Sequence, residues 1–208
     1  MVAVRDGEAT PWLRREGAAD LDRLELSQGP PDRAASPPAD VRIRPARPRD
    51  ARSYLEFWRA IVAEGRAVRT ESVTSPAHVY RARFRRPWTD REAQIVAVER
   101  GRVVGHVYVQ RELHPVTRHV ATLGIAVAAD RRSLGIGTAL MAEAIRWGRS
   151  VGVEKLMLSV YPTNRAAIAL YRRFGFVDEG RLVRHSRKSY GYEDEVLMAA
   201  WIGPEPPG

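Results

Sequence analysis

The 208-residue sequence contains no cysteine, which rules out disulfides, cysteine-ligated zinc and a cysteinyl catalytic intermediate. Its five histidines, at positions 78, 106, 114, 119 and 185, lack the spacing of a metal site, so we expect no metal ion. No apolar run approaches the roughly 18 residues of a membrane-spanning helix, and the N-terminus lacks the long apolar segment of a signal peptide. These absences predict a soluble, cytoplasmic protein without a membrane partner.

Lysine is almost absent, since the 34 basic residues include only Lys155 and Lys188. The formal net charge of +9 therefore comes from arginines, which occur in every segment of the chain rather than in one cluster. Nucleic-acid binding requires a clustered basic patch. The charge favours a solvated arginine-rich surface, and a nucleic-acid-binding module stays open as the less favoured function.

Length and patterning favour one domain with short extensions. Residues 1–40 are rich in Pro, Ala, Asp and Arg, and we expect a flexible arm there. Hydrophobic periodicity runs from Val41 to Ile202, a length sufficient for one hydrophobic core, and residues 203–208 form a C-terminal tail.

Strand and helix periodicities alternate within residues 41–202. We expect helices over residues 50–62 and 135–150, and a short helix that Ser75 caps, Pro76 opens and Arg85 ends. Because a helix connects them, the strands at 118–127 and 155–161 must run parallel. The remaining expected strands cover residues 41–45, 93–100, 103–110, 176–185 and 193–201.

The most informative segment is Arg132-Ser-Leu-Gly135-Ile-Gly137-Thr138, which separates an apolar strand from a helix. Glycines remove the Cβ atoms that would keep a diphosphate from the backbone, and the first helical turn leaves amide donors unpaired. A tight turn without a ligand is the structural alternative. The segment lacks the Gly-Lys-Ser/Thr of a Walker A loop and the third glycine of a dinucleotide fingerprint.

A second block follows the strand that ends at Tyr161: Pro-Thr-Asn164-Arg-Ala-Ala-Ile-Ala-Leu-Tyr171-Arg-Arg-Phe-Gly-Phe176. Together, in this order and spacing, the two blocks resemble the GNAT superfamily of N-acetyltransferases, and the resemblance covers roughly residues 41–202. It implies an α+β fold with a mixed, mostly antiparallel sheet of six to seven strands. Helices would cover both faces, and a splayed parallel pair would form the cofactor cleft.

The resemblance also implies a set of acetyl-CoA-binding residues. The pantetheine arm would pair with the backbone between the splayed strands, and the amide of Val127 would polarise the thioester carbonyl as an oxyanion donor. The diphosphate would lie on the glycine loop, near the charge of Arg132. The implied residues are Ile125, Ala126, Val127, Arg132, Leu134, Gly135, Ile136, Gly137, Thr138, Asn164, Tyr171 and Arg173.

Two of these residues also have structural interpretations. By the resemblance, Asn164 binds the pantetheine and the Tyr171 hydroxyl protonates the departing thiolate as general acid, whereas the alternatives are a helix cap and a half-buried aromatic. Arg172 or Arg173 would reach the ribose phosphate, or both are solvated charges. Seven residues separate Asn164 from Tyr171, so both face one side of a helix.

The resemblance implies direct transfer of acetyl from acetyl-CoA to a primary amine of a small molecule, peptide or protein. Family members often carry a glutamate base on the strand before the glycine loop, but residues 118–129 contain none. The base is unidentified, with Glu71, Glu112, His114 and His119 as the titratable candidates. A catalytically decayed acyl-CoA-binding regulator is therefore an alternative function, and a homodimer is an open alternative to a monomer.

The acceptor itself is not specified by the sequence. Residues 64–71 and 184–192 are the segments that would shape its pocket, and neither has a diagnostic pattern. Glu193, Asp194 and Glu195 would attract a cationic acceptor, or they form a charged turn before the last strand.

Overall fold

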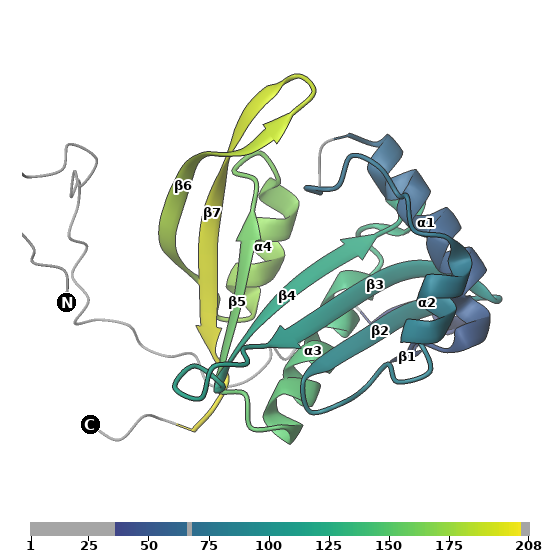
Figure 1. The fold of residues 1–208 in the computed structure, drawn as a ribbon, viewed down its shortest axis with the longest axis horizontal. Coiled ribbons are helices and arrows are strands. Elements are labelled where there is room, and N and C mark those ends of the chain that lie inside the picture. Colours follow the sequence, from purple (N-terminus) through teal and green to yellow (C-terminus); the bar gives the residue numbers. More distant parts are fainter. Residues whose placement is uncertain (1–35, 66–67, 205–208) are drawn as a thin grey trace, which may run out of the picture.

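The computed structural model describes residues 36–65 and 68–204, so the expected N-terminal arm and C-terminal tail lie largely outside the described residues. The described residues form one seven-stranded sheet in the order β1-β2-β3-β4-β5-β7-β6 (Figure 1). β4 and β5 are parallel neighbours, and the other neighbouring strands pair antiparallel. The strands are β1 Val41–Pro45, β2 Glu92–Glu99, β3 Arg102–Arg111, β4 Val120–Val127, β5 Lys155–Val160, β6 Val177–Lys188 and β7 Gly191–Trp201.

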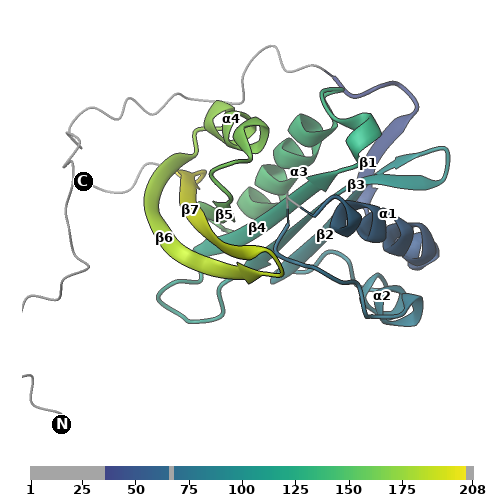
Figure 2. The same cartoon turned by 90° about the horizontal axis from the view of Figure 1, so that it is seen from above.

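Helices cover both faces of the sheet, as predicted (Figure 2). α1 Ala51–Ala63 and α2 Ala77–Arg83 lie on one face, and α3 Ile136–Ser150 and α4 Arg165–Arg173 lie on the other. None of the described helices has the length and hydropathy to cross a membrane.

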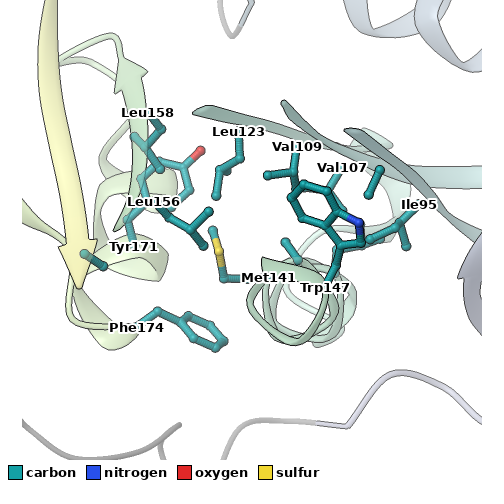
Figure 3. Close-up of a cluster of buried hydrophobic side chains, with 14 of the residues drawn as sticks. Ile95, Val107, Val109, Leu123, Met141, Trp147, Leu156, Leu158, Tyr171 and Phe174 are labelled. Atoms are coloured by element: carbon teal, nitrogen blue, oxygen red, sulfur yellow. The ribbon is translucent and has the colours of Figure 1, made fainter. Parts of the chain in front are cut away.

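The larger core cluster fills the space between the sheet and the α3/α4 layer. One face of α3 is apolar, and its residues Ile136, Leu140, Ala144 and Trp147 are all buried there. Figure 3 shows Trp147 and Met141 of α3 facing the sheet residues, with Tyr171 of α4 and the C-cap residue Phe174 beside them. This cluster fixes α3 and α4 relative to β4 and β5, and hence fixes the elements that carry the two sequence blocks.

The second cluster lies under α1 and α2. Tyr54, Phe57 and Ile61 of α1 pack with Phe84 against Val96 of β2 and its neighbours. This packing holds α1 along its length. The C-terminal end of α1 therefore lies near the end of the sheet where β4 and β5 separate (Figure 1).

Several predicted boundaries are wrong. Ser75 does not cap α2, because Pro76 has an extended backbone (φ −74°, ψ 163°) and itself occupies the N-cap position. The helix ends at Arg83 rather than Arg85. β6 continues to Lys188, and β7 begins at Gly191. Residues 193–195 therefore lie inside a strand and do not form a turn.

Candidate active site

The two parallel strands separate after three residue pairs. β4 and β5 pair from Val120 opposite Lys155 to Thr122 opposite Met157, and the pairing stops there although both strands continue. The strands diverge visibly toward their C-terminal ends (Figure 1). The β4 backbone from Leu123 onward therefore has no strand partner on the β5 side.

The register of β3 and β4 determines which backbone groups face this gap. Ala128 donates its amide to Val104 O at 2.9 Å and Val120 O accepts from Glu112 N at 2.9 Å, so even-numbered β4 residues bond to β3. The backbone groups of Ile125 and Val127 consequently point toward β5, as a main-chain ligand site requires. Ala126 corrects the expectation, because its N–H and C=O face β3 and only its side chain borders the cleft.

The glycine loop ends in an exposed set of backbone donors at the start of α3. Ala139 N donates to Gly135 O at 3.0 Å, and within the described residues the amides of Gly135, Ile136, Gly137 and Thr138 donate to no carbonyl. Gly135 has a φ of 77°, a left-handed conformation that other residues rarely adopt. A Cβ at Gly137 would lie 3.2 Å from Leu170 Cδ2, so this glycine also allows α4 to approach α3. Both the anion-site and the tight-packing interpretations therefore have a structural basis.

Arg132 borders this cradle, but its charge is already paired. Its Nη2 donates to Glu64 Oε2 at 2.5 Å, and its Nε donates to Val127 O at 3.1 Å. Arg173, from the last turn of α4, reaches Thr138 Oγ1 at 3.4 Å and borders the same space. Arg172 instead pairs with Asp178 at 3.4 Å.

α4 carries the second sequence block with Asn164 as its N-cap. Asn164 Oδ1 accepts from Ala167 N at 3.2 Å, which confirms the cap, and its Nδ2 has no partner within the described residues. The Tyr171 side chain is buried among apolar neighbours, and that burial raises the pKa of its hydroxyl. In Figure 3 the Tyr171 hydroxyl is directed toward Leu123 of β4 and Leu158 of β5.

These features enclose a cavity of about 510 Å³. It is lined by the β4 residues Ile125, Ala126 and Val127, the loop residues Arg132, Ser133, Gly135, Gly137 and Thr138, the α4 residues Asn164, Ala166, Ala167, Leu170, Tyr171 and Arg173, and by Ile61 and Val68. Of the predicted residues, Leu134 and Ile136 are not part of this lining, because Leu134 is exposed and the Ile136 side chain is in the core.

A family model described as "Acetyltransferase (GNAT) family" matches residues 58–176. The chain belongs to the GNAT acetyltransferase family. It is 34% identical over 110 residues to the L-amino acid N-acetyltransferase AaaT of Escherichia coli (strain K12), covering 51% of this chain and 66% of that relative. Over 180 residues it is 29% identical to a mycothiol acetyltransferase of Parafrankia sp. (strain EAN1pec), covering 78% of this chain and 55% of that relative.

The solved structures agree with this fold. A GNAT superfamily phosphinothricin acetyltransferase from Sinorhizobium meliloti, solved in complex with AcCoA, superposes with a TM-score of 0.71 at 25% identity. The match covers 81% of this chain and 94% of that structure. The splayed strands, the glycine loop and α4 of this chain are thus the parts of a GNAT fold.

A second cavity of about 210 Å³ adjoins the first. Val68, Ile125, Asn164 and Tyr171 line both cavities and mark where they meet. The second cavity is otherwise lined by Trp58, Arg69, Thr70, Tyr108, Thr122, Leu123, Gly124, Ser159, Val160, Tyr161 and Glu195. A Cβ at Gly124 would overlap the Tyr108 ring, so this glycine allows the ring to lie across β4.

An ion pair between Arg69 and Glu195 forms one wall of the second cavity. Arg69 Nε donates to Glu195 Oε1 at 2.8 Å, and Ser186 Oγ donates to the same oxygen at 2.6 Å. Burial acts to raise the pKa of Glu195, but hydrogen bonds from Arg69 and serine hydroxyls outweigh it and hold the pKa at about 2. Glu195 is therefore ionised and fully engaged, which corrects the expectation that it forms part of a charged turn.

The four candidate bases named from the sequence lie outside both cavities. Glu71 accepts hydrogen bonds from the amide and hydroxyl of Ser189 at 3.0 and 3.1 Å, which lower its pKa. Glu112 and His114 lie in the connection from β3 to β4, and His119 O accepts from Lys155 N at 3.1 Å. These three are at the end of β4 where it pairs with β5, away from the gap. Among the described residues no group of three or more His, Cys, Asp or Glu could hold a metal ion.

Sequence reasoning missed the aromatic and charged lining of the second cavity. Trp58 falls within the helix predicted over residues 50–62 and Tyr161 at the end of a predicted strand, and neither pattern indicates a role in a cavity. Tyr161 was detectable in principle, because it directly precedes the Pro162 that opens the second block. Arg69 had no such signal, since its partner Glu195 is 126 positions away in the chain.

Proposed function

We propose that this chain transfers an acetyl group from acetyl-CoA directly to a primary amine of a small acceptor. The observation that carries the proposal is the junction of the two cavities at Ile125, Asn164 and Tyr171. The larger cavity offers unpaired backbone donors along its length, and the smaller one leads to the same point. The amine-acetylating relatives, named for L-amino acids and mycothiol, support an amine acceptor for this chain as well.

The residues of the larger cavity suit the parts of acetyl-CoA. The free amides at the start of α3 offer donors to the diphosphate, and the absence of Cβ atoms at Gly135 and Gly137 leaves room for it. The backbone of Ile125, the amide of Val127 and the free Nδ2 of Asn164 offer partners to the amide groups of the pantetheine arm, while Val127 O already accepts from Arg132 Nε. Arg173 adds positive charge at the same end, and Arg132 borders it with its own charge paired to Glu64. Acetyl-CoA supplies the activated acyl group.

The acceptor nitrogen attacks the carbonyl carbon, so that a C–N bond forms and the C–S bond breaks. A backbone N–H of β4, that of Val127 in our assignment, stabilises the negative charge that develops on the carbonyl oxygen. Tyr171 stays protonated because burial raises the pKa of its hydroxyl. A thiol is more acidic than such a phenol. Tyr171 therefore acts first as a hydrogen-bond donor to the departing sulfur, and the proton that the amine loses finally neutralises the thiolate.

No carboxylate or histidine is available as the base at the junction of the described cavities, because Glu195 is bound to Arg69. The acceptor amine must therefore enter in its neutral form or lose its proton to water. The same observation favours one second candidate, an acyl-CoA-binding regulator that has lost catalysis.

Isothermal titration with acetyl-CoA, followed by detection of released thiol across a broad amine panel, tests both functions. We expect micromolar binding and acceptor-dependent thiol release. Binding without thiol release from any amine supports the regulator, and absence of binding contradicts both.

A further inference from the structure

The second cavity holds a carboxylate that is unable to receive an amine. Among the described residues Glu195 is the one acidic residue that lines it, and its side chain is 1% exposed. Oε1 accepts from Arg69 Nε and from Ser186 Oγ, and Oε2 accepts from Arg69 Nη2. A cationic group that entered this cavity would find the negative charge already neutralised.

Arg69, unlike Glu195, can still bind a charged ligand, because one edge of its guanidinium is free. Nε and Nη2 hold Glu195, and Nη2 also donates to Ser159 Oγ at 2.6 Å. Within the described residues Nη1 has no partner, and the side chain is 57% exposed. A guanidinium that is fixed on one edge presents its remaining N–H donors in a set direction, which suits an oxyanion.

The backbone around Arg69 is fixed as well. Lys188 Nζ donates to the carbonyl oxygens of Val68 and Arg69, each at 2.7 Å. Glu71 accepts from the amide of Ser189 at 3.0 Å, so the turn between β6 and β7 binds this segment at two places. Because the backbone on both sides of Arg69 is already fixed, a ligand that binds Arg69 orders little additional chain, and the loss of conformational entropy on binding is small.

The charged groups around the cavity balance in number but differ in accessibility. Arg69 and Lys188 lie beside Glu195 and Glu71, and Lys188 is 7% exposed with hydrogen bonds only to carbonyls. Lys188 Nζ also lies 5.6 Å from the ring centroid of Tyr161, whose buried hydroxyl has no partner among the described residues. The site therefore combines a free cationic edge with an unsatisfied hydroxyl, and buried hydroxyls usually have partners.

We propose that the second cavity binds the acid group of a small amine acceptor, with Arg69 as its anion-binding residue and Glu195 as the positioning residue that orients Arg69. This proposal rests on the acetyltransferase function and names its substrate class, an amine that also carries a carboxylate or phosphonate. Polyamines and other multiply cationic amines are disfavoured, because Glu195 is already paired and the accessible charge of the cavity is the free edge of Arg69. A volume of about 210 Å³ restricts the acceptor to a small molecule.

Matched acceptors test the charge preference. The full chain, saturated with acetyl-CoA, is assayed with L-amino acids, their carboxamides, aminoalkyl phosphonates and diamines. We expect kcat/KM to be at least about tenfold higher for the acids than for the carboxamides and diamines. The amine of an amino-acid carboxamide loses its proton more readily than the amine of the free acid. This difference favours the carboxamides, so a preference for the acids cannot result from it. The phosphonates separate a carboxylate-specific site from a general oxyanion site.

Variants of the ion pair test the residues. Arg69→Lys keeps the charge and removes the planar fork, and we expect about a 10- to 100-fold loss of kcat/KM for acids with little change for carboxamides. Arg81→Gln, on the exposed surface of α2, is the matched control for a lost surface charge and leaves both rates unchanged. Glu195→Gln should raise the KM for acids while kcat is retained, a split that general destabilisation does not produce.

Because a buried charge without its partner destabilises a fold, the double variant Arg69→Gln/Glu195→Gln removes both charges together. It should fold, retain acetyl-CoA affinity and lose the preference for acids. Carboxamides or diamines that react as well as acids with the native chain would overturn the proposal. The proposal would also be overturned if the chain binds acetyl-CoA but acetylates none of the acids and none of the acids raises its melting temperature. Failure to bind acetyl-CoA instead overturns the proposed function.

Discussion

Replacing Tyr171 by phenylalanine isolates the chemical step from the fold. The ring stays in its buried position, packed 5.8 Å from the ring of Phe176 between centroids. Burial raises the pKa of the hydroxyl, which has no hydrogen-bond partner among the described residues. Deleting the hydroxyl therefore removes no interaction of the folded chain, and we expect the melting temperature to stay unchanged.

The rate should change because the hydroxyl lies where the two cavities meet. A hydrogen bond to a charged group contributes about 1.5–3 kcal/mol. If Tyr171 makes this bond only while negative charge develops on the sulfur, Tyr171→Phe lowers kcat about 10- to 150-fold. The acetyl-CoA dissociation constant should remain within about twofold, since the same bond is weak in the ground state.

The assay combines stopped-time thiol detection at saturating acceptor with calorimetric titration of acetyl-CoA. Tyr80→Phe, which removes a hydroxyl from α2 outside both cavities, is the matched control and should keep the native kcat. A Tyr171→Phe turnover within twofold of native would refute the role of the hydroxyl. A fall in acetyl-CoA affinity without a fall in kcat would place Tyr171 in binding rather than in catalysis.

Three further outcomes follow from individual contacts. Gly124→Ala puts a methyl group into the ring of Tyr108, so the KM of the acceptor should rise about tenfold or more while calorimetry finds unchanged acetyl-CoA affinity. Glu64→Gln frees Arg132 from its ion pair at 2.5 Å, and titration should find acetyl-CoA bound up to about fivefold more tightly; weaker binding would show that the pair holds the loop open. The pKa of Glu195 is about 2 in the fold against an ordinary 4.5, so its contribution to stability is complete above pH 4.5 and is lost as the pH falls toward 2. Urea unfolding across that range should show the loss, and Glu195→Gln should flatten it.

The parts of the site that lie close together in the sequence could be predicted from it. The glycine loop, the helix after it and the block from Asn164 to Tyr171 are continuous segments, and their local geometry follows from glycine conformations, helix termini and apolar spacing. Their order then indicated the family, and the family implied the splayed strands. The prediction for Ala126 failed at the level of register, because periodicity cannot say which edge of a strand meets which neighbour.

The acceptor side could not be predicted, because its contacts join segments that are distant in the chain. Read locally, residues 193–195 are a run of three acids that invites a cationic acceptor. In the fold, strand alternation sends Asp194 outward to Arg181 at 2.9 Å and Glu195 inward to Arg69. Glu195, one of the three acids that would attract an ammonium, is instead bound by an arginine 126 positions away, and we infer that the free edge of that arginine favours the opposite charge. In our proposal the charge preference for the acceptor therefore depends on one long-range ion pair, which the run of acids at positions 193–195 does not indicate.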